Sequence, residues 1–199
     1  LGVHLLREHG RALDLPRRFS IADRDDSVVM IKTALQDLGY DPKSLEPRRI
    51  LNVISREKGR LMTLENYLEK LELNAFGQVV GEIWRRYEAA LRAAESLDFD
   101  DLILKAVLLL RQHPDILTFC QARWHYLHID EYQDTNVAQY QLAKLLTGER
   151  ENICAVGDLD QSIYSWRGAD FKNLLRFEHD FPRAVVVTLE ENYRSTKTI

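Results

Sequence analysis

The chain of 199 residues has few of the features that mark secreted, disulfide-rich or membrane-spanning proteins. Its two cysteines, Cys120 and Cys154, form no Cys-x-x-Cys pair, which argues against a disulfide framework and favours a reducing, cytoplasmic compartment. No run approaches the roughly 18 apolar residues of a membrane span. Glycine and proline number only nine and five, which excludes collagen-like and low-complexity chains. We expect a soluble, folded chain with both cysteines in its core.

An excess of charge of one sign is also missing. Lys and Arg together number 27 and Asp and Glu 31, for a formal net charge of −4 at pH 7. The charge of the whole chain therefore gives no indication of nucleic-acid binding, and any such surface has to be local.

Hydrophobic periodicity divides the chain into a helical part and an alternating part. The spacing predicts the end of a helix at residues 1–10, a short strand at 19–23, and helices at about 23–39, 47–59, 64–73, 76–94 and 98–113. Strand-like runs at 126–130, 153–156 and 184–189 then alternate with helices at 137–146 and 171–181. This alternation favours an α/β fold with a parallel sheet. The helix after Asp98 is predicted to bury Phe99, Leu102, Ile103, Ala106, Val107 and Leu110.

Chemistry in parallel sheets gathers at the carboxyl ends of the strands, and the first such end carries Asp130 and Glu131. Adjacent carboxylates suit a site for Mg²⁺ and a nucleotide, because one holds the metal or its water shell while the other accepts a proton from an attacking water. The alternative is that the two acidic residues only end a strand on the solvated rim of the sheet.

The second strand end covers residues 156–169. Gly157 permits a tight exit from the strand, and Asp158, Asp160 and Gln161 supply polar groups close to the first carboxylate pair. Asp158 and Asp160 are open to a second interpretation as structural turn residues.

The same segment continues with Tyr164, Trp166 and Arg167. Aromatic faces beside a guanidinium form a platform on which unpaired bases stack. The alternative is that these rings close the core of the sheet.

The third strand end covers residues 189–196. Arg194 in this position is suited to neutralise charge on a phosphoryl group, and Tyr193 to stack on a nucleobase. An arginine after two glutamates is, alternatively, a surface ion pair.

Taken together, residues 130–136, 156–169 and 189–196 closely resemble motifs II, III and IV of the superfamily 1 DNA helicases of the UvrD/Rep/PcrA family. Residues 97–103 resemble a further stretch of these proteins, and residues 1–7 resemble the helix after their motif Ia. The order, the spacing and the flanking strands all agree, and the resemblance covers essentially the whole chain.

The resemblance implies an α/β fold in which residues 1–22 and 98–199 form part of a RecA-like ATPase domain of the P-loop NTPase type. Residues 23–97 would form an inserted all-helical subdomain. No glycine of the chain is followed by lysine, so the phosphate-binding loop is absent. We therefore expect a fragment whose second motor domain belongs to the same polypeptide and which, alone, is inactive.

The resemblance also implies roles for single residues in binding ATP and Mg²⁺. Asp130 would help to hold the metal, and Glu131 would contribute to the metal site and activate the hydrolytic water. Gln161 would sense the γ-phosphate, Tyr193 would stack on adenine, and Arg194 would contact the γ-phosphate.

Single-stranded DNA would meet Tyr164 and Trp166, with Arg167 as electrostatic support. Residues 43–60 carry a local excess of basic side chains that would either contact the duplex backbone or form a solvated helix face. The basic residues are Lys43, Arg48, Arg49, Arg56, Lys58 and Arg60, against Glu46 and Glu57.

The function implied for the parent protein is that of an ATP-dependent helicase of the bacterial cytoplasm, associated with the nucleoid and with no membrane partner. It would move 3′ to 5′ on single-stranded DNA and unwind duplex DNA. Two alternatives stay open, namely the motor of a helicase–nuclease and a single-strand-binding module without turnover. A carboxylate metal nuclease using Asp130, Glu131, Asp134 and Asp158 would leave Trp166 and Tyr193 unexplained.

Overall fold

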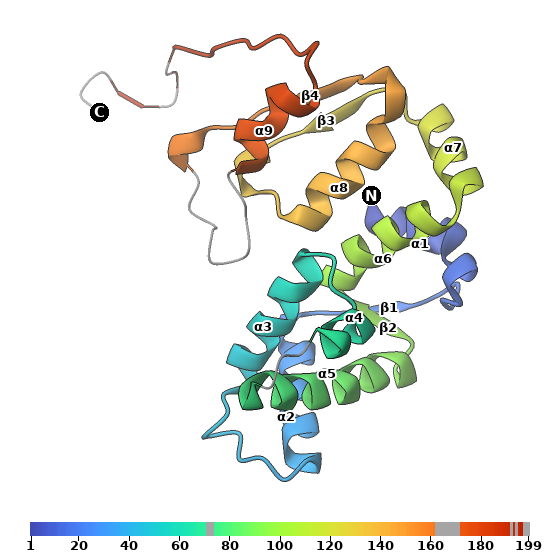
Figure 1. The fold of residues 1–199 in the computed structure, drawn as a ribbon, viewed down its shortest axis with the longest axis vertical. Coiled ribbons are helices and arrows are strands. Elements are labelled where there is room, and N and C mark those ends of the chain that lie inside the picture. The colour runs from blue at the N-terminus through green and yellow to red at the C-terminus, as the bar shows by residue number, and fades with distance from the viewer. Residues whose placement is uncertain (71–73, 162–171, 192, 194, 197–199) are drawn as a thin grey trace.

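The computed structural model describes residues 1–70, 74–161, 172–191, 193 and 195–196 (Figure 1). Helices dominate this part of the chain, and its strands are short. The elements are α1 (Gly2–His9), β1 (Ser20–Ala22), α2 (Arg24–Asp37), α3 (Pro47–Gly59), α4 (Leu64–Glu69), α5 (Ala75–Ala93), β2 (Ser96–Asp98), α6 (Phe99–Gln112), α7 (Pro114–Arg123), β3 (Leu127–Ile129), α8 (Val137–Thr147), β4 (Ile153–Ala155) and α9 (Lys172–Asp180).

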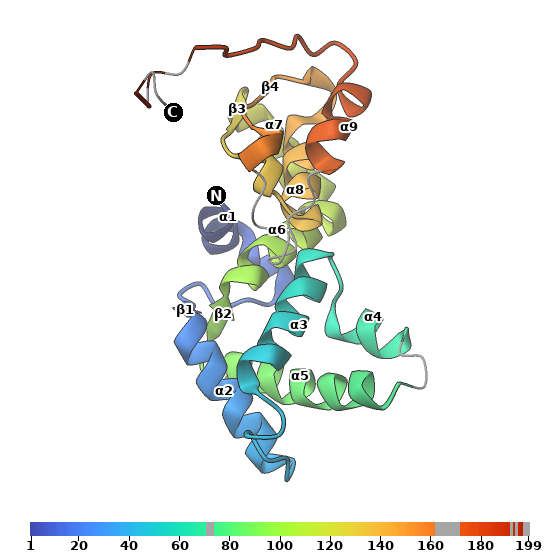
Figure 2. The same cartoon turned by 90° about the vertical axis from the view of Figure 1, so that its left-hand side faces the viewer.

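Helices α2 to α5 form one end of the molecule, and two views at right angles show them apart from the β3–β4 sheet (Figures 1 and 2). The side chain of Asp23 caps α2, Pro47 begins α3, and Asn74 caps α5. Their apolar faces share one core. Its largest buried members are Ile31, Leu35, Ile50, Ile54, Ile83, Trp84, Tyr87 and Leu91.

Strands β1 and β2 pair in parallel with Ser20 opposite Ser96 and Ala22 opposite Asp98. The chain therefore enters the α2–α5 helices and leaves them at neighbouring points. Helix α6 starts directly after β2 and packs against α1 and α8, so it connects the two ends of the molecule (Figure 1). The second core consists of Leu5, Leu6, Phe19, Leu97, Leu102, Ala106, Val107, Leu109, Leu110, Cys120, Leu142 and Leu146.

Strands β3 and β4 form the second sheet, in parallel register with His128 opposite Cys154. Helix α8 packs on β3, whereas the side chains of His128 and Cys154 are exposed. Successive side chains of a strand point to opposite faces, so these two lie on the face that α8 does not cover. The expectation of a buried Cys154 is therefore wrong, while Cys120 is buried as expected.

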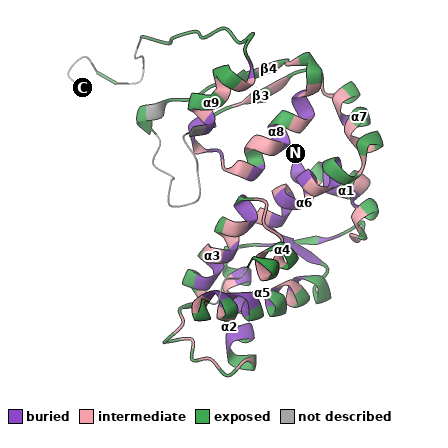
Figure 3. Cartoon of the chain, in the orientation of Figure 1, coloured by how far each residue is buried: buried purple, intermediate pink, exposed green. Residues whose placement is uncertain are grey.

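Most of the predicted helices and strands are confirmed, including the helix that Asp98 caps. Helix α7 and strand β2 were not predicted. The prediction of a strand at residues 184–189 is wrong, because this segment is extended but pairs with no described strand, and Val185 is 85% exposed (Figure 3). The prediction that Phe99 is buried is also wrong, since 60% of it is exposed.

No helix among the described residues is both long enough and apolar enough to cross a membrane.

Candidate nucleotide site

The predicted carboxylates lie where β3 ends. Asp130 and Glu131 follow Ile129 directly, and both are exposed. Beyond the paired residues of β3 and β4, Val156 N donates to Ile129 O at 2.8 Å and Tyr132 N donates to Val156 O at 2.9 Å. These two bonds hold the segments that follow β3 and β4 side by side, as a shared sheet edge requires.

Glu131 has a left-handed backbone conformation, with φ of 49° and ψ of 45°. This conformation is unfavourable for a residue with a side chain, and it persists only where neighbouring contacts hold it. One such contact is the bond from Glu131 N to Asp130 Oδ1, at 2.9 Å. The tight turn keeps both carboxylates at the end of the strand.

A buried amide connects this turn with the loop after β4. Gln133 is 1% exposed and lies in a 3₁₀ turn, Tyr132–Asp134. Its Nε2 donates to Glu131 Oε2 at 2.8 Å, and its Oε1 accepts from Asp158 N at 3.0 Å. Sequence analysis assigned Gln133 no role, although it lies within the motif that carries Asp130 and Glu131.

Asp158 continues the connection to Gln161. Its Oδ1 accepts from Asp160 N at 3.0 Å and its Oδ2 accepts from Gln161 Nε2 at 2.6 Å. These two bonds, the Gln161 bond first, lower the pKa of Asp158. The interpretation of Asp158 as a turn residue is supported, and the turn also holds the Gln161 amide. Glu131 and Gln161, predicted from separate motifs, thus belong to one hydrogen-bonded chain.

The carboxylate pair of Asp130 and Glu131 has no ion-pair partner among the Lys, Arg and His side chains of the described residues. No group of three or more His, Cys, Asp or Glu side chains in the described residues could hold a metal ion. Mg²⁺ is commonly bound by only one or two carboxylates together with water and substrate phosphates. The carboxylate pair therefore fits magnesium as part of a nucleotide site and not as a metal site made by the protein alone.

Tyr193 is a further predicted site residue that the structure describes, and it is not brought to these carboxylates. Tyr193 is 85% exposed, and its hydroxyl donates to Glu191 Oε2 at 2.8 Å. No hydrogen bond in the described part of the chain joins Tyr193 to Asp130, Glu131 or Gln161. The remaining predictions lie outside the described residues, and they concern Tyr164, Trp166, Arg167 and Arg194.

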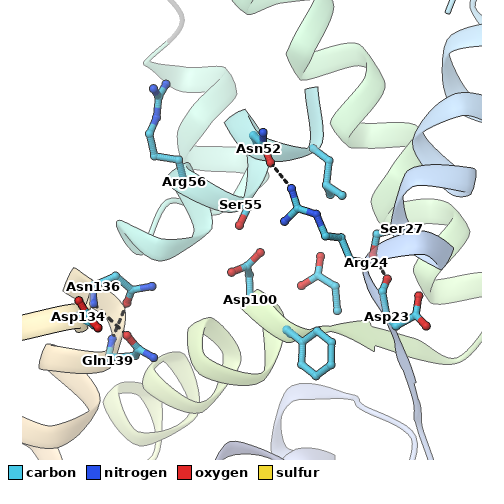
Figure 4. Close-up of a pocket in the computed structure, with 13 residues that line it drawn as sticks. Asp23, Arg24, Ser27, Asn52, Ser55, Arg56, Asp100, Asp134, Asn136 and Gln139 are labelled. Carbon is cyan, nitrogen blue, oxygen red and sulfur yellow. Dashed lines mark hydrogen bonds between the residues drawn. The ribbon is translucent and has the colours of Figure 1, made fainter. Parts of the chain in front are cut away.

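A cavity of about 620 Å³ opens between the α2–α3 helices and the β3–α8 turn (Figure 4). Asn52 accepts from Arg24 at 2.6 Å on one wall, while Asp134 and Asn136 lie on the opposite wall. Between them lies Asp100, whose pKa is raised by burial.

The exposed ring of Phe99 lines the same cavity. The pattern predicts a buried ring because the spacing of Phe99 matches the buried face of α6. The cavity wall carries charges of both signs, from Arg24 and Arg56 and from Asp23, Asp98, Asp100 and Asp134.

The basic segment at residues 43–60 divides in the structure. Lys58 is 1% exposed, so it is excluded both from contact with duplex DNA and from a solvated face. Its Nζ lies 2.9 Å from each of three carboxylates, those of Glu88, Asp98 and Asp101. Arg56 and Arg60 are exposed, and both pair with Glu57.

Comparison with known proteins agrees with the predicted motifs. The profile of the UvrD/REP helicase N-terminal domain family matches residues 1–182. The chain is 46% identical over 197 residues to the ATP-dependent DNA helicase PcrA of Bacillus subtilis, 44% over 197 residues to that of Staphylococcus aureus, and 43% over 199 residues to that of Leuconostoc citreum. These matches cover at least 99% of the chain but only 26–27% of each relative, so the chain spans about a quarter of their length.

Proposed function

The chain belongs to the UvrD/REP helicase N-terminal domain family, and from this we propose that it is part of the motor of an ATP-dependent DNA helicase. The parent protein couples ATP hydrolysis to 3′–5′ movement on single-stranded DNA and to duplex unwinding. The observation that carries the proposal is the hydrogen-bonded chain from Glu131 through Gln133 and Asp158 to Gln161. It joins a carboxylate suited to activate water with an amide suited to a phosphate.

In the proposed ATP site, Asp130 and Glu131 hold Mg²⁺, which when bound neutralises charge on the phosphates. Glu131 orients the attacking water and accepts its proton. The Gln161 amide meets the γ-phosphate. Tyr193 and Arg194 complete the site by stacking on adenine and contacting the γ-phosphate.

The proposed path of single-stranded DNA includes Tyr164, Trp166 and Arg167. From the described residues we add Phe99, because its exposed ring on the cavity wall offers a surface on which a base of the strand can stack.

The domain division is also a proposal. Residues 1–22 and 98–199 belong to a RecA-like domain, and residues 23–97 form an insertion. The pairing of β1 with β2 supports it, because an insertion has to leave and re-enter its host domain at neighbouring points. The chain alone is inactive, since it has no phosphate-binding loop.

The test uses the full-length protein. We expect ATP hydrolysis that single-stranded DNA stimulates, and unwinding of a duplex with a 3′ tail in preference to one with a 5′ tail. The isolated chain should hydrolyse no ATP under the same conditions. A full-length protein that binds single strands without any turnover would overturn the proposal in favour of a binding module.

A further inference from the structure

Within the described part of the nucleotide site, Gln133 is a fully buried side chain in which both polar atoms form hydrogen bonds. Its Nε2 bonds Glu131 after β3, and its Oε1 bonds Asp158 after β4. We propose that Gln133 is a positioning residue, which fixes the carboxylate of Glu131 and ties its orientation to the loop that carries Gln161. The inference rests on the proposed ATPase function and assigns a role to a residue outside the predicted site.

The orientation of the Gln133 amide follows from its partners. Asp158 N–H can only donate, so the atom that faces it at 3.0 Å has to be the carbonyl oxygen of the amide. The amide nitrogen then faces Glu131 Oε2 at 2.8 Å, where it donates to a carboxylate. Hydrogen bonds to an ionised acceptor are stronger than neutral ones, so this bond holds the Glu131 carboxylate more firmly than a bond between neutral groups would.

The bond also orients the glutamate. Gln133 occupies Oε2 of Glu131, while no bond from a described residue engages Oε1. The backbone of Glu131 is fixed by its left-handed turn and by Asp130 Oδ1. With Oε2 held by Gln133, Oε1 is the oxygen of Glu131 that is left to accept a proton from water.

The β4 side of the site makes room for this amide. A Cβ placed on Gly157 would lie 2.9 Å from Gln133 Oε1, closer than packed atoms approach. Gly157 does not have a positive φ, so its backbone would accept alanine without strain. The glycine is therefore required for the space that Gln133 fills.

The connection continues to Gln161 through Asp158, whose backbone N–H bonds Gln133 and whose carboxylate bonds Gln161 Nε2. A shift of Gln161 toward or away from a phosphate moves Asp158, and through it the Gln133 amide. Such linked polar groups act as one unit, so their substitutions should not be additive.

The experiment measures kcat and KM for DNA-stimulated ATP hydrolysis by the full-length protein. Gln133→Met keeps the length of the side chain and removes both hydrogen bonds. We expect kcat to fall by roughly 10–100-fold with little change in KM for ATP. Gln121→Met is the matched control, because it removes a half-buried glutamine bond to Leu145 O at 2.7 Å that does not reach the site.

Gln133→Glu provides a readout that a purely structural role would not move. Its carboxylate still accepts from Asp158 N–H, but it has no hydrogen to donate to Glu131 Oε2 and it repels that carboxylate. We therefore expect kcat to fall at least as far as in Gln133→Met, with little change in KM for ATP. Gly157→Ala, which leaves Gln133 itself intact, should lower kcat in the direction of Gln133→Met.

Two failures are distinguishable. If the wild-type protein hydrolyses no ATP, or if Glu131→Gln keeps full turnover, the proposed function fails. If the wild type and Glu131→Gln behave as proposed while Gln133→Glu keeps kcat within a few-fold of the wild type, the positioning role alone is overturned. This second variant also decides the matter if Gln133→Met fails to fold.

Discussion

Two groups of acidic residues in this chain have the same chemistry and opposite environments. The carboxylate pair, Asp130 and Glu131, is exposed and meets no cation in the described part of the chain. The second group consists of Glu88, Asp98 and Asp101 around Lys58, and we call it the lysine cluster. Lys58 Nζ lies 2.9 Å from each of the three carboxylates, and Asp98 and Asp101 are 5% and 1% exposed.

The difference follows from what each carboxylate is bonded to. In the lysine cluster, Asp98 caps α6, accepts from the Tyr87 hydroxyl at 2.9 Å and pairs with Lys58. It therefore joins α3, α5 and α6. In the carboxylate pair, the bonds come from a neighbouring N–H and from the Gln133 amide, which fix the geometry without neutralising the charge. Carboxylates satisfied by a buried cation hold the fold, whereas carboxylates that are oriented but not neutralised are available to a ligand.

The largest expected effect concerns the carboxylate pair. Glu131→Gln in the full-length protein should lower ATP turnover by roughly 10²–10⁴-fold while ATP and DNA binding are kept, because the amide cannot accept a proton from water. Steady-state hydrolysis and equilibrium binding measure the two properties separately.

Glu151→Gln is the matched control. Glu151 also has a left-handed backbone, with φ of 53°, but its carboxylate pairs with Arg183 on the surface. Its turnover should equal that of the wild type. Turnover of Glu131→Gln within a few-fold of wild type would remove Glu131 from the mechanism.

The second effect is on stability. Lys58→Met leaves three carboxylates without their cation, and breaking a buried ion pair from one side costs about 3–5 kcal/mol. Urea unfolding of the chain should show this loss. Lys32→Met, at an exposed position of α2, should change the unfolding free energy by no more than about 0.5 kcal/mol. Equal losses in the two variants would show that the lysine cluster does not hold the helices together.

The sequence predicts helices and strands well where neighbouring residues determine where they begin. Asp23, Asp98 and Asn136 each accept a bond from a backbone N–H three residues later, so the starts of α2, α6 and α8 follow from short patterns. Helix α7 was not predicted, although it begins at Pro114 and proline suits the first turn of a helix.

The determinants that sequence analysis missed are non-local. Residues 184–189 have the composition of a strand, but a strand forms only where another strand supplies its hydrogen bonds. In the same way, the residue types at Asp130 and Glu131 predict a magnesium and nucleotide site from local sequence, whereas the position of the Gln133 amide depends on the approach of Gly157 after the next strand. Lys58 was counted as a surface charge because its three partners lie 30 or more positions away.

The third prediction concerns Asp101, the member of the lysine cluster whose pKa is raised. Burial, reinforced by Asp98 and Glu88 against the opposing effect of Lys58, raises the pKa of Asp101 from 3.8 to about 6. The folded chain therefore holds this proton more tightly than the unfolded chain. Its stabilising contribution is complete below pH 3.8 and is lost as the pH rises through about 6.

Asp101→Asn removes this dependence. As the pH rises from about 4.5 to about 7.5, the free energy of unfolding of the variant should increase by about 1–3 kcal/mol relative to that of the wild type, because only the wild type loses stability over this range. Urea unfolding at the two pH values measures the difference. Asp115→Asn, at an exposed position on α7, should show no such trend. A parallel response of the two variants would mean that Asp101 does not titrate differently in the folded state.

The smallest effect concerns Phe99, which lies between the two groups, directly after Asp98 and on the wall of the cavity that Asp134 also lines. If the cavity takes a base of single-stranded DNA, Phe99→Ala in the full-length protein should weaken single-strand affinity by about 1–3 kcal/mol with no change in ATP affinity. Fluorescence anisotropy with a labelled oligonucleotide measures the loss. Phe119→Ala is the control, because that ring is 48% exposed on α7 and lies outside the cavity. Equal affinities for the two variants would show that the surface between the lysine cluster and the carboxylate pair takes no part in DNA binding.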